Sequence, residues 1–147
     1  MKLAKDFKLT QNFMINEFLH SDDKSEISVE DYINIHRLCL KLQELRNIVG
    51  GININSGYRS NEYNKKIGGS TDSYHTYGLA ADIKFSFASW TIETLLPVLN
   101  YLGFTNAGFY MRKNKFVWIH LDIGKTWGNK YGWQPYNEGL SYKIYEV

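Results

Sequence analysis

The sequence predicts an α+β fold, with a small antiparallel sheet, helices packed on one face of the sheet and a groove on the other. Two stretches carry apolar residues at spacings of three and four, as amphipathic helices do. Several shorter stretches alternate apolar and polar residues, as half-buried strands do. These patterns follow one another as helix, strand, loop, strand, helix and hairpin, an order typical of α+β proteins.

The longest predicted helix follows an extended lead-in at 5–10, a helical turn at 16–19 and a polar loop at 21–28. Ser28 is its expected N-cap, with Asp31 three residues later, and Gly50 and Gly51 end it. One apolar stripe runs along this helix: Ile35, Leu38, Cys39, Leu42, Leu45 and Val49. A stripe of this kind predicts one buried face.

The remaining elements are shorter. Strands are predicted at 52–55, 80–85, 107–110 and 115–123, with helical turns at 61–67 and a second helix at 90–102. Pro97 should kink that helix or split it in two. Residues 111–114 are the expected turn of a hairpin. Gly57, Gly68, Gly69 and Gly78 predict turns with positive φ.

Length and composition indicate one domain spanning residues 1–147. Its core is expected at about 7–127, followed by an aromatic tail at 128–147. The tail reads as irregular until a last strand at 140–145. Its Trp and Tyr residues could line a groove, although we expect them to pack as a cap over the sheet.

Charge and composition exclude several functions. The net charge is +2 without a run of Lys or Arg, so no nucleic-acid partner is predicted. No stretch approaches about 18 apolar residues, so membrane insertion is not expected. Cys39 is the only cysteine, which excludes an internal disulfide. The N-terminus has no apolar segment typical of a secretory signal.

Three side chains could bind a zinc ion. His75 lies in a polar loop, Asp82 in the predicted strand 80–85, and His120 in the strand 115–123. Two imidazoles and a carboxylate can hold zinc while leaving a fourth position for water. Alternation along the last strand places His120 on one face with Trp118 and Asp122, and places Val117, Ile119 and Leu121 on the core face. The site is therefore expected in the groove.

Several motifs accompany these residues in a fixed order. They are Ser56-Gly57-Tyr58-Arg59-Ser60, Asn64, Gly68-Gly69-Ser70, Ser73-Tyr74-His75, Gly78, Ala80, Asp82 and His120-Leu121-Asp122. Together they resemble the LAS-type zinc peptidases, and more narrowly the family of D-Ala-D-Ala carboxypeptidases and L-alanyl-D-glutamate endopeptidases. The resemblance covers roughly residues 7–127.

The resemblance implies roles for individual residues. His75, Asp82 and His120 match the three zinc ligands of the family. Arg59 matches an arginine that binds the peptide's carboxylate or the developing oxyanion, a task that suits the forked guanidinium. Ser73 matches a position that lines the substrate cleft.

One departure concerns the general base. Many family members have an acidic residue three positions before the second histidine ligand, where this chain has Val117. Related peptidases have a histidine at the position of Trp118, which we expect to contact the substrate. Asp122 could be the base, or it could orient the second histidine. Glu62 and Asp72, in nearby loops, are weaker candidates.

These observations predict a zinc-dependent hydrolase of peptidoglycan stem peptides, acting as a D,D-carboxypeptidase or an endopeptidase. A phage-encoded endolysin or virion-associated lysin fits best, located in the host cytoplasm until lysis or in the virion, with bacterial peptidoglycan as its partner. A bacterial wall-remodelling enzyme is a further possibility. The alternative class is a virion structural or wall-binding protein, in contact with other virion or tail proteins, that keeps the fold and the zinc site but has little or no activity.

Overall fold

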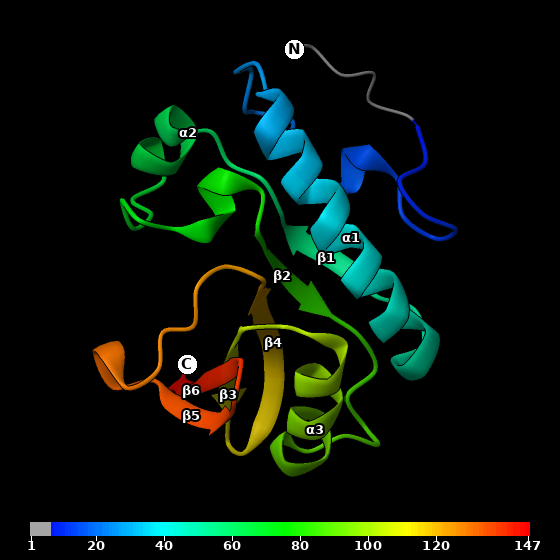
Figure 1. Ribbon diagram of the computed structural model, residues 1–147, viewed down its shortest axis with the longest axis vertical. Coiled ribbons are helices and arrows are strands. Elements are labelled where there is room, and N and C mark those ends of the chain that lie inside the picture. Colours follow the sequence, from blue (N-terminus) through cyan, green and yellow to red (C-terminus); the bar gives the residue numbers. More distant parts are fainter. Residues whose placement is uncertain (1–6) are drawn as a thin grey trace.

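The computed structural model describes residues 7–147 and has an α+β fold (Figure 1). Residues 5 and 6 of the expected lead-in lie outside the described residues. The helices are α1 (Val29–Val49), α2 (Asn61–Lys66) and α3 (Ile92–Leu102), with 3-10 helices η1 (Ile15–Glu17), η2 (Tyr74–Tyr77) and η3 (Lys130–Gly132). The strands are β1 (Asn53–Ser56), β2 (Ala80–Lys84), β3 (Asn106–Arg112), β4 (Lys115–Asp122), β5 (Gln134–Asn137) and β6 (Leu140–Glu146).

All six strands form one sheet in the order β1-β2-β4-β3-β6-β5. Four neighbouring pairs are antiparallel, but β3 and β6 are parallel, so the expectation of a purely antiparallel sheet is wrong at this pair. The reason is the order within the last hairpin. Its second strand, β6, docks on β3, and β5 pairs outside it at the sheet edge. The last strand expected at 140–145 is confirmed as β6, whereas β5 forms within the part of the tail that was expected to be irregular.

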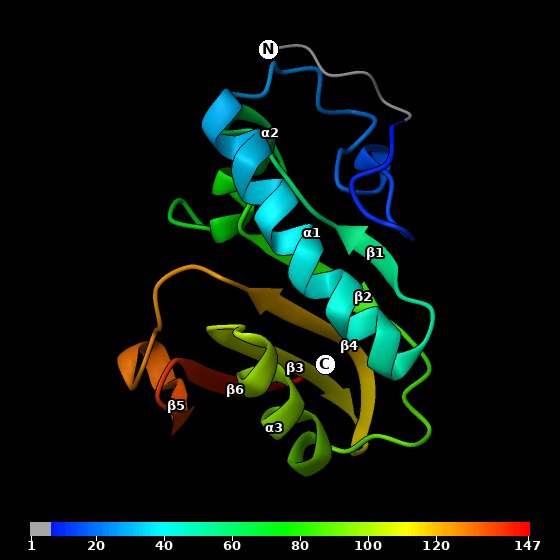
Figure 2. The same ribbon diagram turned by 45° about the vertical axis from the view of Figure 1, so that its right-hand side comes forward.

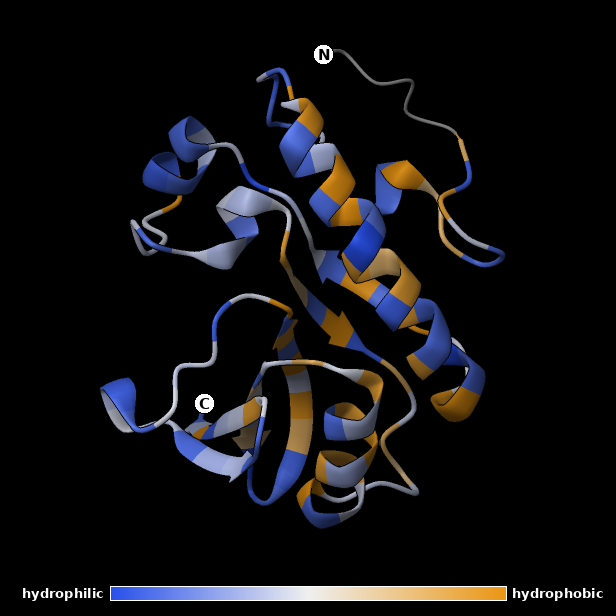
Figure 3. Ribbon diagram, viewed as in Figure 1, coloured by the Kyte–Doolittle hydropathy of each residue, from blue (hydrophilic) through white to orange (hydrophobic). Residues whose placement is uncertain are grey.

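Helices α1 and α3 lie together on one side of the sheet and cover the hydrophobic core (Figures 1 and 2). The stripe of α1 is buried as predicted, apart from the partly buried Val49. Ser28 is the N-cap, since its side chain accepts the N–H of Asp31 at 3.0 Å. Hydrophobic and hydrophilic residues alternate around α1 and along the central strands (Figure 3). The alternation reflects one buried and one open side of each element.

Helix α3 runs without interruption through Pro97, so the expected split is wrong. A proline removes one backbone hydrogen bond from a helix. Here the neighbouring turns are held by buried Leu95, Leu96 and Leu99. Packing of these leucines in the hydrophobic core therefore compensates for the missing bond.

Strand β4 contains a bulge at Val117. Tyr110 of β3 is opposite Trp118, whereas the next residue, Met111, is opposite Phe116, so β4 has one extra residue. Phe116 packs against the core with Phe109 and Phe87, at ring-centroid distances of 5.9 and 4.9 Å. The prediction that Val117 shares the core face with Ile119 and Leu121 is wrong, because the bulge gives that place to Phe116.

The glycine prediction holds at two of four positions. Gly68 and Gly78 have φ of 75° and 73°, whereas Gly57 and Gly69 do not have positive φ. Gly57 is needed for close packing instead, since a Cβ there would lie 2.8 Å from the backbone of Phe18. This contact fixes the start of the segment that leads to Arg59.

Candidate metal centre

Three candidate metal ligands come together in space: His75 on η2, Asp82 on β2 and His120 on β4. Each offers a ligand atom, and these atoms all lie within 4.8 Å of one another. Asp82 and His120 are directly opposite on the paired strands β2 and β4. Oδ1 of Asp82 lies 3.3 Å from Nε2 of His75 and 3.1 Å from Nδ1 of His120. The two strands and the helical turn thus bring three potential metal ligands to one point.

A hydrogen bond to the backbone orients the ring of His75. Its Nδ1 lies 2.7 Å from the carbonyl oxygen of Gly57, which can only accept a hydrogen bond. Nδ1 therefore carries the proton, and Nε2 is free toward Asp82. Ser73 begins the turn by accepting the N–H of His75, and Gly78 ends it in the left-handed conformation. The turn presents one defined nitrogen to the site.

His120 has a carboxylate on each side of its ring. Nδ1 faces Asp82, and Nε2 lies 2.9 Å from Oδ2 of Asp122. A carboxylate on the outer nitrogen is the usual support of a metal-binding histidine, because it fixes the ring and its tautomer. Both imidazoles of the cluster thus have their outer nitrogen occupied and their inner nitrogen directed at Asp82.

Asp122 is in turn fully engaged. Its side chain is 0% exposed. Oδ1 accepts hydrogen bonds from Nδ2 of Asn106 at 2.7 Å, from Oγ1 of Thr105 at 3.2 Å and from N–H of Gly124 at 3.2 Å. Oδ2 bonds to His120. This carboxylate is rigidly placed behind the histidine ring.

Asn106 extends the network beyond the residues that the sequence singled out. Its Nδ2 donates to Asp122 and also to the carbonyl of Lys125 at 2.7 Å. Its Oδ1 accepts the N–H of Trp127 at 2.9 Å and the hydroxyl of Ser141 at 2.6 Å. The amide therefore joins β4, the following loop and β6. No local pattern marks Asn106, since its partners are all distant in sequence.

Burial and charge act in opposite directions on the two central groups. Burial raises the pKa of Asp82, but the hydrogen bond from His120 and the proximity of His75 outweigh burial and hold the pKa well below the usual range. Burial lowers the pKa of His120, but Asp122 and Asp82 outweigh it and raise the pKa. In the absence of a metal, His120 therefore holds a proton between the two carboxylates, and a metal ion would have to displace that proton to bind the inner nitrogen.

Arg59 lies beside the cluster. Its NH2 group is 3.6 Å from Oδ2 of Asp82, and its other nitrogens donate to Ser56 at 3.2 Å and to Asn64 at 3.2 Å. Its side chain is 16% exposed. The structure thus places the guanidinium at the second oxygen of Asp82. Arg59 does not line the cleft that His120 lines.

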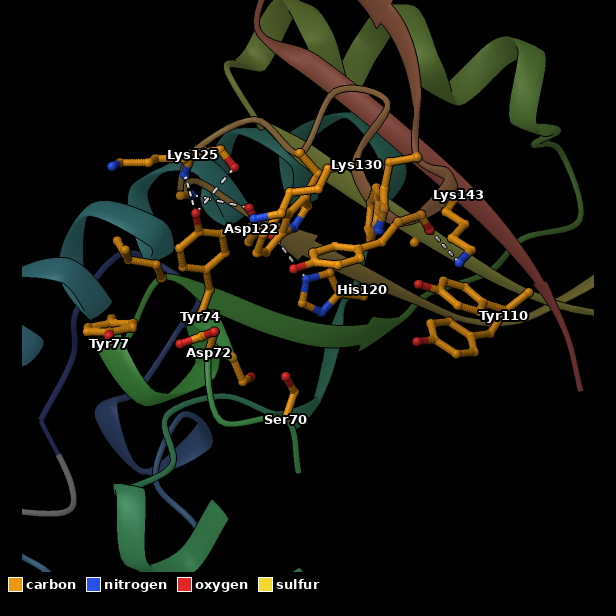
Figure 4. Close-up of a pocket in the computed structure, with 18 residues that line it drawn as sticks. Ser70, Asp72, Tyr74, Tyr77, Tyr110, His120, Asp122, Lys125, Lys130 and Lys143 are labelled. Atoms are coloured by element: carbon orange, nitrogen blue, oxygen red, sulfur yellow. Dashed lines mark hydrogen bonds and ion pairs between the residues drawn. The ribbon is translucent and has the colours of Figure 1, made fainter. Parts of the chain in front are cut away.

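A cleft of about 840 Å³ opens beside the cluster, and of the three candidate ligands His120 lines it (Figure 4). Ser73, His120, Asp122 and Asp72 line it, whereas Trp118 does not. The Trp118 ring instead stacks on Tyr110, with centroids 3.5 Å apart. Glu62 lines a separate, smaller pocket. A metal bound in this cleft stays a prediction.

The tail contributes much of the cleft wall. Trp127, Tyr131 and Trp133 line the cleft, and Tyr136 packs against the core. The expectation of a cap over the sheet is therefore wrong for the first three rings, and the groove-lining alternative applies to them. The tail's strands extend the sheet edge, so its rings stand beside the cleft.

An α+β domain with a His-Asp-His cluster beside a cleft defines a candidate metal-dependent hydrolase. The family model of peptidase M15 matches residues 11–122, and the chain belongs to this family. The match includes the whole cluster and ends at the last residue of β4, before β5 and β6. Among curated proteins no significant match was found. Within residues 7–147, no helix has the length and apolarity to cross a membrane.

Proposed function

We propose that this protein is a zinc-dependent peptidase that hydrolyses the peptide stems of bacterial peptidoglycan, as a D,D-carboxypeptidase or an endopeptidase. The observation that carries the proposal is the convergence of His75, Asp82 and His120, whose ligand atoms lie within 4.8 Å of one another. Membership of the peptidase M15 family supports it independently.

The donor set fits zinc. Tetrahedral zinc, with ligands at about 2.0–2.2 Å, separates its ligand atoms by roughly 3.3–3.6 Å. Asp82 lies 3.3 and 3.1 Å from the inner nitrogens of His75 and His120, close to this range, and all three ligand atoms lie within 4.8 Å of one another. When bound, zinc polarises a scissile carbonyl and lowers the pKa of water.

The surrounding residues would prepare the site for that chemistry. Asp122 orients His120 and, through Asn106, ties it to the sheet. Gly57 keeps His75 in the tautomer whose Nε2 is free. Arg59 places a positive charge next to Asp82, from which it could bind a substrate carboxylate or steady the oxyanion. Ser73 lines the cleft, where it could contact the substrate.

For the general base, the geometry favours Asp72 over Asp122. Both oxygens of Asp122 are already bonded within the fold, and one of them holds His120. A base must reach the reacting water directly. Asp72 is the other carboxylate that lines the cleft among residues 7–147, and it is exposed. Asp72→Asn should therefore lower kcat without lowering zinc affinity.

The test combines metal analysis with hydrolysis of purified cell walls and soluble stem peptides. We expect one zinc per chain, and release of peptide fragments that stops with a chelator and returns with zinc. His120→Ala should abolish both metal binding and release. His36→Ala, on α1 and outside the cluster, is the matched control and should retain both. No cleavage of any wall substrate at full zinc occupancy would refute the proposal.

A second candidate function is favoured by one observation. Val117 occupies the position where the family resemblance led us to expect an acid, and it forms the extra residue of the β4 bulge. A virion structural or wall-binding protein could keep the fold and the metal without turnover. In that case the protein would bind zinc and bacterial cell walls but would release no peptide fragments from them. We further propose a setting for each function. The peptidase would be a phage endolysin or a virion-associated lysin, and the inactive alternative would be a component in contact with other virion or tail proteins.

A further inference from the structure

One row of residues crosses four strands of the sheet through the metal cluster. Asp82 on β2 is opposite His120 on β4, His120 is opposite Gly108 on β3, and Gly108 is opposite Lys143 on β6. Residues in one row point to the same face of a sheet. Lys143 is therefore on the same face as the candidate metal ligands, two strands from His120.

Gly108 leaves a slot between His120 and Lys143. A Cβ at this position would lie 3.4 Å from Cβ of His120 and 3.4 Å from ring carbons of both Tyr110 and Tyr145. A larger side chain would fill the space that these groups enclose. The rings of Tyr110 and Tyr145 are stacked, with centroids 4.5 Å apart and an angle of 9°, and form one wall of the slot. The slot is continuous with the cleft, because all five residues line it together.

Lys143 is held in place but has no acidic partner. Its Nζ donates to the carbonyl of Tyr131 at 2.8 Å and lies 5.1 Å from the ring centroid of Tyr145. Within residues 7–147, no carboxylate forms an ion pair with it. An ammonium group has three N–H donors, so two are left for a ligand. A half-buried, ordered cation of this kind suits an anionic group.

The rest of the cleft reinforces this charge. Lys125 and Lys130 also line it, and Figure 4 shows Lys130 and Lys143 across the cleft from Asp72. Of the carboxylates that line it, Asp122 is already bonded within the fold. The tail side of the cleft is therefore cationic, which raises the local concentration of anionic ligands.

We propose that Lys143 and the slot over Gly108 form a subsite that binds a carboxylate of the substrate peptide. This inference rests on the proposed function and narrows its substrate to an acidic peptide. Two strand spacings separate Lys143 from His120 by roughly 10 Å, the reach of about three extended residues. The recognised carboxylate would thus belong to a residue within about three positions of the scissile bond.

The cation of the subsite and one of its two tyrosines lie outside the part of the chain that matches the family model. That match ends at residue 122, whereas Lys143 and Tyr145 are on β6. The matched region supplies the metal cluster, Gly108 and Tyr110, and the last hairpin supplies the cation Lys143. Substrate choice would therefore be determined by a different segment from the one that supplies the metal ligands.

The experiment uses three stem peptides of one sequence: one with its glutamate and C-terminal carboxylates free, and one each with the glutamate or the C-terminus amidated. Lys143→Gln is compared with the wild type and with Lys115→Gln, an exposed lysine of β4 that does not line the cleft. Hydrolysis gives KM and kcat. Quenching of tryptophan fluorescence by a non-cleavable analogue of each peptide gives Kd without turnover.

In the wild type, one of the two amidations should weaken binding and raise KM by about 10- to 100-fold, as expected for a hydrogen bond to a charged group. The amidation that does so identifies the carboxylate. In Lys143→Gln that preference should disappear, whereas Lys115→Gln should keep it. Equal affinity of all three peptides for the wild type, or an unchanged preference in Lys143→Gln, would overturn the inference. Lys143-dependent binding without cleavage would instead contradict only the proposed peptidase activity.

Discussion

Oδ2 of Asp122 lies 2.9 Å from Nε2 of His120, on the side of the ring that faces away from Asp82. The imidazole is thus fixed between two carboxylates, and only its inner nitrogen is directed at the site. Such an arrangement makes Asp122 a positioning residue for His120. Its role can be separated from that of a general base by experiment.

Asp122→Asn should weaken zinc binding by about 10- to 100-fold, since loss of an outer carboxylate typically has this effect on a metal-binding histidine. The fold should persist, because Asn106 and Gly124 surround the new amide with polar partners. Competition with a chromogenic chelator gives the zinc Kd, and circular dichroism reports the fold. If kcat fell while the zinc Kd stayed unchanged, Asp122 would be the base instead.

Asn106→Ala should destabilise the protein by about 2–4 kcal/mol, because it leaves several buried polar groups without a partner at about 1–3 kcal/mol each. The side chain makes four hydrogen bonds and is 0% exposed. Urea unfolding measures the loss. Asn34→Ala is the control and should cost much less, since it removes two exposed bonds, one to the carbonyl of Tyr77 and one from Arg37. Equal losses in the two variants would contradict the importance of the buried network.

Zinc should stabilise the native protein against heat. At a free zinc concentration of 100 times Kd, binding contributes about 2.7 kcal/mol. For a chain of this size that corresponds to a rise in Tm of roughly 5–10 °C. Thermal scans with zinc and with a chelator measure it. Asp82→Ala should show no zinc-dependent shift, and a shift of the same size in that variant would place the metal elsewhere.

Cys39 should react slowly and only at high pH. Burial raises its pKa from 9.0 to about 11, although a hydrogen bond with Thr10 opposes the shift. At pH 8 this higher pKa reduces the fraction of Cys39 present as thiolate about 100-fold, and the thiolate is the reactive form. The rate of alkylation of the folded protein should therefore still rise with pH above 9, whereas the rate for the urea-unfolded chain should level off.

The same shift has a consequence for stability. The folded state holds the Cys39 proton more tightly than the unfolded state. The protonated thiol therefore contributes to the free energy of unfolding below pH 9, and this stabilisation is lost as the pH rises toward about 11. If the alkylation rates of the folded protein and of the unfolded chain both levelled off near pH 9, the thiol would not be shielded in the fold.

Local patterns in the sequence were sufficient for several elements. The apolar stripe of α1 and the Ser28 cap depend on residues three or four apart, so the helix could be recognised without any partner. The hairpin of β3 and β4 is likewise a local structure. The metal cluster was recognised because its three residues belong to motifs whose order resembles a known family, and the match to peptidase M15 confirms that resemblance.

Other features depend on contacts between distant segments. The bulge at Val117 depends on how β3 and β4 pair, and the parallel position of β6 depends on which strand of the last hairpin docks on β3. Lys143 reaches the cleft, and Asn106 gains its bond to Ser141, only through that docking. The sequence by itself determined the helices, the candidate ligands and the family. Only the tertiary structure decided what supports the ligands and which cation faces them, because pairing between strands is set by packing across the whole sheet and has no local signature.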